Sequence, residues 1–160
     1  MNKAYLLTGG NLGEREKNLD TARQLIDEQC GKVNLSSSLY ETAAWGNTNQ
    51  PSFLNQALII DTTLNAQLLL QQLLKIEKMM GRIREEKYGP RIIDIDILLF
   101  NEEIHDLPFL KIPHPELQNR RFALMPLAEI AGAIIHPVYK KSILILLGEC
   151  NDQLAVKKYT

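Results

Sequence analysis

The stretch YGPRIIDIDILLF, from Tyr88 to Phe100, begins with a glycine–proline turn and continues as an apolar run that is typical of a buried strand. Asp94 and Asp96 interrupt this run at alternate positions. Because the side chains of a strand alternate between its two faces, both carboxylates are expected on one face, together with Leu98 and Phe100. The opposite face is expected to be aliphatic, formed by Ile93, Ile95, Ile97 and Leu99.

The segments before this strand predict two helices and three further strands. Apolar side chains recur at helical spacing in Glu14–Gln29 and in Asn65–Met80. Strand patterns occupy Lys3–Thr8, Lys32–Tyr40 and Phe53–Thr62. The order is therefore strand, helix, strand, strand, helix, strand, which is the order of a split βαβ unit. The sequence predicts an α+β fold, a ferredoxin-like antiparallel sheet with helices packed on its faces.

The pattern after Phe100 is less regular. Residues 111–132, KIPHPELQNRRFALMPLAEIAG, predict a proline-bounded loop followed by short helical pieces, with Pro126 at a helix start. Residues 142–149 predict a final short helix. No repeat or linker divides the chain, so we expect one domain over residues 1–160, a length that suffices for one hydrophobic core.

Composition limits the classes of function. Eighteen basic and nineteen acidic residues give a formal net charge of −1, which is too balanced to hold nucleic acid by phosphate neutralisation alone. Five of the seven arginines fall between residues 82 and 121, so an anion site is expected there. The two cysteines lack zinc-site spacing, and no apolar run approaches the ~18 residues of a membrane span. We expect a cytoplasmic protein that binds neither nucleic acid nor membrane, and that is a monomer, with a dimer left open.

The pair formed by Asp94 and Asp96 has two interpretations. Residues i and i+2 of a strand are ~6.6 Å apart, so their carboxylates can converge on a hard cation such as Mg²⁺ that carries substrate phosphates. An isolated Asp-x-Asp pair is more often the solvated face of a half-exposed strand. The nearby Arg82, Arg84 and Arg91 favour a metal-bound polyphosphate, because guanidinium groups bind phosphate in bidentate fashion.

Three other features stay open when taken alone. The glycine-rich GGNLG after the first strand lacks the spacing of either nucleotide-binding fingerprint and predicts a strand-to-helix turn. His114, in the tripeptide PHP, is either a phosphate donor or a loop histidine. Phe53 and Phe122 are expected in the core on their residue type alone.

The segment KYGPRIIDIDIL, Lys87 to Leu98, resembles the signature of the 6-hydroxymethyl-7,8-dihydropterin pyrophosphokinase family. That signature asks for a basic residue, an aromatic, Gly-Pro-Arg, two variable positions, Asp-aliphatic-Asp and two aliphatics, and every position is met. Similarity continues through GGNLG, YETAAWG, QPSFLNQAL, IEKMMGRIR, IPHPELQNRRF and MPLAEIA, which span nearly the whole chain. The resemblance implies a ferredoxin-like enzyme of folate biosynthesis that transfers the terminal pyrophosphate of ATP to the hydroxymethyl oxygen of the pterin and releases AMP.

For the nucleotide, the resemblance implies ATP as co-substrate with two Mg²⁺ ions. Asp94 and Asp96 would hold the ions, and Asp96 is also a candidate acceptor of the hydroxyl proton. Arg82 and Arg91 would grip the transferring phosphates as catalytic residues. The residues expected to bind ATP are Glu77, Arg84, Tyr88, Ile97, Lys111, His114 and Arg120.

For the pterin, the resemblance implies a ring stacked between Phe53 and Phe122 and held by hydrogen bonds from neighbouring residues. A flat heterocycle gains from aromatic faces, and fixed donors and acceptors reject analogues that cannot pair with them. The residues expected to bind this substrate are Thr42, Ala44, Trp45, Phe53, Asn55 and Phe122.

The chain departs from the residues that are frequent in the family at a few positions. Two prolines are often found where this chain has Ala43 and Ala44, tyrosine where it has Phe53 or Pro115, and tryptophan where it has Tyr88. These changes affect loop stiffness and hydroxyl contacts rather than the metal site. The alternative function is a non-catalytic ATP/pterin sensor on the same fold, and an RNA-binding sheet is disfavoured by the net charge.

Overall fold

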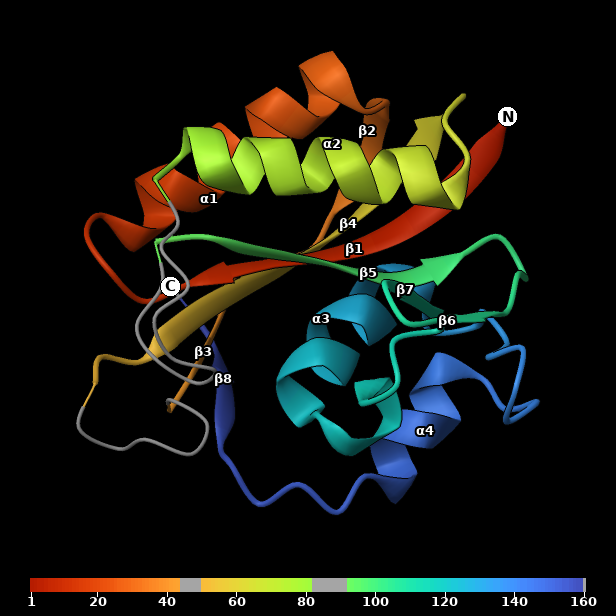
Figure 1. Cartoon of the computed structure of the whole chain (residues 1–160). Helices are drawn as coiled ribbons and strands as arrows, with labels where there is room; N and C mark the ends of the chain where they lie inside the picture. Colours follow the sequence, from red (N-terminus) through yellow and green to blue (C-terminus); the bar gives the residue numbers. More distant parts are fainter. Residues whose placement is uncertain (44–49, 82–91, 160) are drawn as a thin grey trace.

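The computed structural model describes residues 1–43, 50–81 and 92–159. Figure 1 shows a central sheet with helices on both of its faces. Along the chain the elements are β1 (Asn2–Gly10), α1 (Arg15–Gln29), β2 (Lys32–Ser36), β3 (Tyr40–Thr42), β4 (Phe53–Thr62), α2 (Ala66–Met79), β5 (Asp94–Phe100), β6 (His105–Leu107), β7 (Leu110–Ile112), a 3₁₀ turn (Leu117–Asn119), α3 (Arg121–Ala131), α4 (Ile143–Glu149) and β8 (Val156–Lys158).

The main sheet has the strand order β5-β1-β4-β3-β8, and β2 also pairs with β4. Every pairing in it is antiparallel. β1 lies between β5 and β4, so the first and last strands of the predicted split βαβ unit are neighbours. The predicted α+β, ferredoxin-like sheet is thus confirmed. β6 and β7 form a separate two-stranded sheet beside it.

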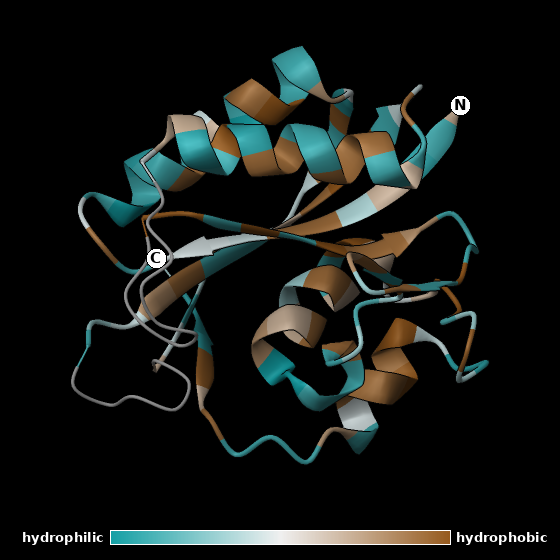
Figure 2. Ribbon diagram, viewed as in Figure 1, coloured by the Kyte–Doolittle hydropathy of each residue, from teal (hydrophilic) through white to brown (hydrophobic). Residues whose placement is uncertain are grey.

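Two apolar cores lie on opposite faces of the sheet. α1 and α2 cover one face and α3 and α4 cover the other (Figure 1). The first core includes the buried stripe of α2, Leu69, Leu73 and Ile76, and the second includes Leu124 and Leu127 of α3. Figure 2 shows apolar colouring along the strands between these layers, whereas α1 is mostly hydrophilic. None of the helices in the described ranges is long and apolar enough to cross a membrane.

The predicted second helix has the expected ends. The Asn65 side chain accepts a hydrogen bond from the Leu68 amide at 2.9 Å, which is the N-cap contact that favours asparagine there. Gly81 follows the helix with φ of +86°, a left-handed conformation that is costly for residues with a side chain. This helix therefore begins and ends for local reasons that the sequence contains.

The alternation predicted for β5 is wrong at its C-terminal end. Leu6 of β1 is opposite Ile97, whereas Tyr5 is opposite Leu99, so Leu98 is an extra residue that forms a β-bulge. The bulge exchanges the faces of the last two residues. Leu99 joins the core under α3 and α4, and Phe100 joins the core under α1 and α2. The two aspartates precede the bulge and keep their shared face.

Two other local predictions need correction, and some short strands were not predicted. The predicted strand Lys32–Tyr40 is divided into β2 and β3. Between them the Ser37 hydroxyl, rather than a backbone carbonyl, accepts the hydrogen bond of the Ala57 amide at 2.9 Å, which interrupts the ladder with β4. Pro126 lies inside α3, which begins at Arg121, so it is not at a helix start. The sequence patterns also missed the hairpin of β6 and β7 and the short β8.

Candidate functional site

Asp94, Gly9 and Asn55 form one row across three neighbouring strands. Gly9 of β1 is opposite Asp94 of β5 on one side and opposite Asn55 of β4 on the other. Neighbouring strands are ~4.8 Å apart, so the backbones at Asp94 and Asn55 are separated by roughly 10 Å. A Cβ at position 9 would collide with the Asn55 amide nitrogen, so a larger residue fits there only if the Asn55 side chain moves. The glycine-rich turn thus has a role in the site that the sequence did not indicate.

The predicted pterin residues of β3 and β4 share the face of this row. Thr42 is directly opposite Phe53, and Tyr40 is opposite Asn55. The Thr42 hydroxyl donates to the Ala155 carbonyl at 2.9 Å, so it can serve a ligand only as an acceptor. Thr42 and Asn55 are buried, whereas Phe53 is half-buried. A polar patch with an accessible aromatic ring beside it suits a flat, hydrogen-bonding ligand.

The bulge in β5 positions His114. The Leu98 carbonyl accepts the His114 backbone amide at 3.0 Å, which places the histidine beside the aspartate-bearing half of the strand. Nδ1 of His114 accepts the Glu116 amide at 3.1 Å, so the neutral ring carries its proton on Nε2. That N–H is the kind of donor that binds a phosphate oxygen.

His114 is held in its neutral form at physiological pH. Its pKa falls from 6.5 to about 4, chiefly because burial disfavours the charged ring and also because the Arg120 guanidinium repels it. Asp94 and Glu116 act in the opposite direction and raise the pKa. These electrostatic contacts place Asp94, His114 and Arg120 in one neighbourhood, and their roles in binding a nucleotide stay a prediction.

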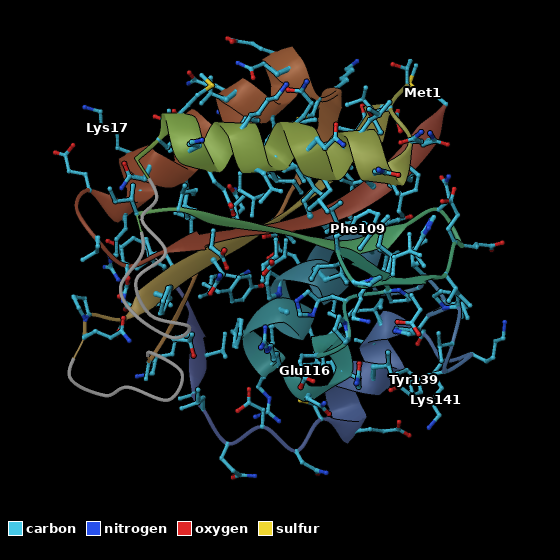
Figure 3. The ribbon with its side chains drawn as sticks, viewed as in Figure 1. Met1, Lys17, Phe109, Glu116, Tyr139 and Lys141 are labelled. Carbon is cyan, nitrogen blue, oxygen red and sulfur yellow. The ribbon has the colours of Figure 1, made fainter. Side chains whose placement is uncertain are left out.

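A shallow pocket of about 240 Å³ lies beside β5 and the β6–β7 hairpin. Asp96, Ile97, Lys111 and His114 are all part of its lining, so four predicted nucleotide or metal residues come together there. Phe109, which also lines it, lies next to β5 in Figure 3. The other lining residues are Leu70, Ile95, Pro108, Leu110, Ile112 and Pro115.

Lys111 lies at the exposed side of this pocket. Its Nζ is 2.7 Å from Oδ1 of Asp106, and this contact lowers the pKa of Asp106 through a hydrogen bond and charge attraction. Exposed ion pairs of this kind contribute little to stability. Lys111 can therefore exchange its carboxylate partner for a ligand anion at small cost.

Glu77 is placed differently from the other predicted ATP residues. It is only 3% exposed on α2, and its Oε2 accepts the Ile95 amide at 2.7 Å. Ile95 lies between the two aspartates, so the buried carboxylate fixes the backbone from which both project. The predicted contact between Glu77 and ATP stays a prediction, and the structure adds a supporting role under β5.

The two adjacent arginines at the start of α3 have different surroundings. The Arg121 guanidinium donates to the carbonyls of Cys150 and Asp152, which ties α3 to the C-terminal segment. Arg120 instead lies 5.7 Å from the ring centroid of Phe122, within the range of a cation–π contact. Of the pair, Arg120 is thus the one that faces the candidate site, next to the aromatic ring predicted to cover the pterin.

The donor set fits a metal ion that also binds substrate oxygens. Asp94 and Asp96 supply carboxylate oxygens from one face of one strand, which are the ligands that Mg²⁺ prefers. Within residues 1–43, 50–81 and 92–159, no cluster of three or more His, Cys, Asp or Glu side chains could enclose a metal alone. Two carboxylates completed by phosphate oxygens and water match the usual Mg²⁺ arrangement.

Six predicted site residues lie outside the described residues: Ala44, Trp45, Arg82, Arg84, Tyr88 and Arg91.

The structure adds Asn11 to the residues that shape the acceptor side. Asn11 is 2% exposed, and its amide donates to the Gln50 side chain at 2.8 Å and to the Pro51 carbonyl at 2.9 Å. The turn after β1 therefore holds the segment that enters β4. Its sequence signal was only an asparagine in a glycine-rich turn, which does not identify a long-range partner.

An antiparallel α+β sheet with paired carboxylates on one face of β5, and a neutral histidine and an arginine beside them in the segment before α3, is an arrangement typical of a phosphate-handling enzyme of the ferredoxin-like class. The model of the family described as 7,8-dihydro-6-hydroxymethylpterin-pyrophosphokinase (HPPK) matches residues 5–132. The chain belongs to this family, as its signature predicted.

Relatives and solved structures agree with this assignment. The chain is 42% identical over 143 residues to the 2-amino-4-hydroxy-6-hydroxymethyldihydropteridine pyrophosphokinase of Aquifex aeolicus, covering 89% of each. It is 45% identical over 134 residues to the enzyme of that name from Bacillus subtilis, covering 83% of this chain and 80% of the relative. It also matches the wild-type HPPK-DHPS crystal structure from Plasmodium falciparum with a TM-score of 0.75. That likeness, at 20% identity over 93% of this chain and 43% of the solved chain, shows the fold alone.

Proposed function

We propose that this chain transfers the pyrophosphoryl group of ATP to the hydroxymethyl group of 6-hydroxymethyl-7,8-dihydropterin, giving AMP and the pterin diphosphate, in folate biosynthesis. Family membership and relatives at 42% and 45% identity that carry this enzyme name support the reaction. The row of Asp94, Gly9 and Asn55 is the observation that carries it in the structure, because it joins a phosphate-binding half to an acceptor-binding half. No observation favours the sensor alternative.

The nucleotide half is assigned to the pocket beside β5. Ile97 and Phe109 offer apolar contacts for the base, and Lys111 offers a cation. His114 donates its Nε2 proton to a phosphate oxygen, and Arg120 adds a full positive charge. Arg82 and Arg91 are proposed to grip the transferring phosphates, and Arg84 and Tyr88 to contact the nucleotide, on the resemblance of their motif alone.

Asp94 and Asp96 would hold two Mg²⁺ ions. When bound, the metal neutralises phosphate charge in the transition state and lowers the pKa of a coordinated hydroxyl group. The anionic side chains of β5 are thus compatible with a polyanionic substrate only together with this cation.

The acceptor half is assigned to β3, β4 and the start of α3. Asn55 offers amide hydrogen bonds and Thr42 an acceptor oxygen to the pterin edge, while Phe53 and Phe122 stack on the ring. Ala44 and Trp45 are proposed as further contacts, on the resemblance alone.

The chemical step asks for positioning rather than covalent catalysis. The hydroxymethyl oxygen forms a bond to the β-phosphorus, the bond from that phosphorus to the oxygen bridging the α- and β-phosphates breaks, and AMP leaves with the electron pair. We assign Asp96 as the acceptor of the hydroxyl proton, because it combines a carboxylate with a place in the phosphate pocket. We also propose that residues 1–160 act as one cytoplasmic domain and as a monomer.

The test is product analysis with a matched pair of variants. The purified chain is incubated with ATP, MgCl₂ and the dihydropterin, and the nucleotides are separated by chromatography. We expect AMP in a one-to-one ratio with pterin diphosphate. Asp96→Asn should lose turnover, whereas Glu102→Gln, an exposed carboxylate just after β5, should keep it. Formation of ADP instead of AMP would overturn the proposed reaction.

A further inference from the structure

We infer that Arg15 is a positioning residue for the acceptor side of the site, acting through the ends of β3 and β4 that carry Thr42 and Phe53. The inference rests on the proposed function. Arg15 is the first residue of α1, a helix that the sequence analysis gave no functional role. It does not lie on the face that holds the substrates, so its effect must pass through other residues.

The Arg15 guanidinium joins two strands that bear predicted pterin contacts. Its Nη1 donates to Oε2 of Glu41 at 2.7 Å and to the Ser52 carbonyl at 2.9 Å. Glu41 immediately precedes Thr42, and Ser52 immediately precedes Phe53. One nitrogen atom therefore fixes the spacing of β3 and β4 at the point where the two contact residues stand opposite each other.

This ion pair is better shielded than an ordinary surface pair. The side chains of Arg15 and Glu41 are 23% and 37% exposed, and the second hydrogen bond to the Ser52 carbonyl fixes the guanidinium orientation. Charge pairs that are partly desolvated and held in one geometry contribute more than mobile surface pairs. Arg23 offers a contrast, because its 2.6 Å contact with Asp20 lies within α1 and joins no other element.

Tyr159, the residue after β8, packs against the same arginine. The Arg15 guanidinium carbon lies 5.7 Å from the ring centroid of Tyr159, and the Tyr159 amide donates to the Leu39 carbonyl at 2.8 Å. The Tyr159 hydroxyl also hydrogen-bonds Glu16, which contributes to the raised pKa of the tyrosine. β8 in turn pairs with β3, whose Thr42 hydroxyl is bound to the segment just before β8.

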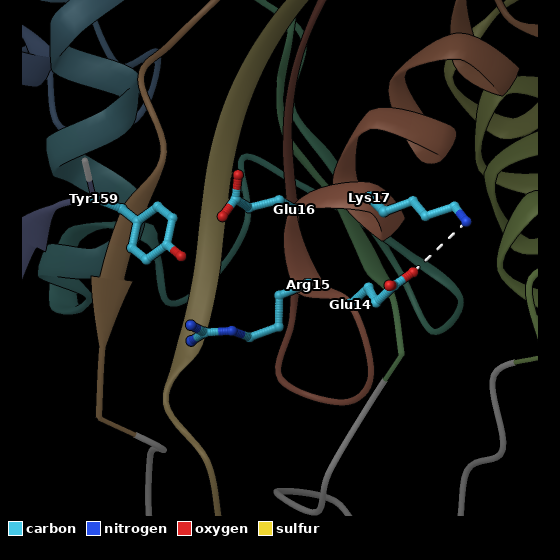
Figure 4. A pocket seen from close by; sticks show the side chains of 5 residues that line it. All are labelled: Glu14, Arg15, Glu16, Lys17 and Tyr159. Atoms are coloured by element: carbon cyan, nitrogen blue, oxygen red, sulfur yellow. Dashed lines mark ion pairs between the residues drawn. The ribbon is translucent and has the colours of Figure 1, made fainter.

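Figure 4 shows how these side chains surround a shallow cavity of about 300 Å³. Arg15 and Glu16 extend toward the side on which Tyr159 lies, whereas Lys17 turns away and pairs with Glu14 at 3.6 Å. The Arg15 side chain thus reaches from the start of α1 to Glu41, Ser52 and Tyr159, whereas Lys17 pairs with the exposed Glu14 at the helix start.

The functional consequence follows from the order of the chain. The polypeptide leaves β3 after Thr42 and returns at Phe53, so the two strand ends form the base of a long connection. Arg15 joins the two ends of that base, and β8 pairs with the other edge of β3. When the Arg15 contacts are removed, the ladder between β3 and β4 remains but the base widens more easily. Binding of the pterin should weaken, because its stacking and hydrogen-bonding groups must hold a fixed spacing.

The test compares Arg15→Ala with Arg23→Ala, which removes an ion pair of similar length from the same helix. Affinity for the dihydropterin is measured by calorimetry in the presence of Mg²⁺ and a non-hydrolysable ATP analogue, and affinity for the analogue is measured alone. We expect Arg15→Ala to weaken pterin binding ~10-fold, equal to ~1.4 kcal/mol, with analogue affinity changed less than twofold. Arg23→Ala should leave both affinities at the wild-type values. Equal weakening of both ligands by Arg15→Ala would mean general destabilisation and would overturn the inference.

A double-mutant cycle identifies the contact responsible. If Arg15 acts through Glu41, the loss of pterin affinity in Arg15→Ala/Glu41→Ala should be smaller than the sum of the two single losses, because each change removes the same interaction. Additive losses would overturn the role of this pair. The outcomes also distinguish the role of Arg15 from the proposed reaction. If the wild-type chain forms AMP and Arg15→Ala binds the pterin normally, only the role of Arg15 is refuted. If the wild-type chain binds no pterin, both proposals are refuted.

Discussion

Replacement of Glu77 by leucine should weaken both the fold and the phosphate-binding strand. The Glu77 carboxylate is buried on α2 and accepts the Ile95 amide at 2.7 Å. β5 is at one edge of the strand order, so this amide has a side chain from α2 as its acceptor in place of a neighbouring strand. Leucine has a similar volume and keeps the apolar packing of the helix, but it leaves the amide without that acceptor.

The expected magnitude follows from the type of hydrogen bond. A bond to a charged acceptor contributes ~1.5–3 kcal/mol, and a buried amide that loses its partner costs a comparable amount. We expect Glu77→Leu to lower the free energy of unfolding by ~2–3 kcal/mol, and Glu77→Gln, which keeps a neutral acceptor, by ~1 kcal/mol. Urea unfolding followed by circular dichroism measures both. Gln71→Leu, on the exposed side of α2, is the control for adding a leucine.

The same variant tests the link between this bond and catalysis. Because Ile95 lies between Asp94 and Asp96, a shift of the backbone should reduce turnover at saturating substrates by roughly 10-fold or more. Pterin affinity should change little, since its contacts come from other strands. A Glu77→Leu protein with wild-type stability would refute the buried hydrogen bond as a stabilising contact. A destabilised variant with full turnover would refute its role in placing the aspartates.

Three further predictions test other parts of the site. Gly9→Ala should weaken pterin binding at least ~10-fold in calorimetry, because the new methyl group displaces the Asn55 side chain. Gly148→Ala, where the added methyl group meets open space, is the control and should keep the wild-type affinity. Unchanged affinity in Gly9→Ala would exclude Asn55 as a pterin contact. The pKa of His114 is lowered from 6.5 to about 4 in the folded chain. Above pH 6.5 the histidine is neutral in both states and this shift has no effect on stability. Below pH 6.5 the histidine of the unfolded chain is protonated while that of the folded chain stays neutral down to about pH 4, so the folded state loses stability as the pH falls. Between pH 7 and pH 4.5 the free energy of unfolding should therefore fall by ~2–3 kcal/mol more in the wild type than in His114→Gln, as measured by urea titration at each pH. An identical pH dependence in the two proteins would contradict a neutral histidine. Asp94→Asn should raise the Mg²⁺ concentration needed for half-maximal turnover ~10-fold or more, and an unchanged Mg²⁺ dependence would remove Asp94 from the metal site.

Much of the fold could be predicted because its long elements are specified locally. The helix capped by Asn65 and the strand Phe53–Thr62 have periodic patterns and marked ends, and both appear in the structure at the predicted places. The bulge at Leu98 could not be predicted in this way, because it depends on the register with β1. β8 is only three residues long and gains its strand conformation by pairing with β3, so its own sequence carries no period.

The candidate site shows the same contrast between features that the local sequence specifies and features that depend on tertiary contacts. Asp94 and Asp96 were placed on one face because their spacing alone decides it, and the histidine in the tripeptide PHP was recognised from its motif. The contribution of Gly9 depends on the side chain of Asn55, which is 46 residues away in the sequence. The contacts of Glu77 with Ile95 and of Arg15 with Glu41 likewise join separate elements. A motif identifies which residues do chemistry, whereas tertiary contacts decide which residues hold them in place.

The most direct test of the central claim is to follow each phosphate of ATP into its product. Three samples of ATP, labelled with ³²P at the α-, β- or γ-phosphate, are incubated separately with the wild-type chain, Mg²⁺ and 6-hydroxymethyl-7,8-dihydropterin, and the products are resolved. The account predicts that the β- and γ-labels both move to the pterin and that the α-label remains in AMP. A γ-label in the pterin with the β-label left in ADP would show transfer of a single phosphate and would contradict the account.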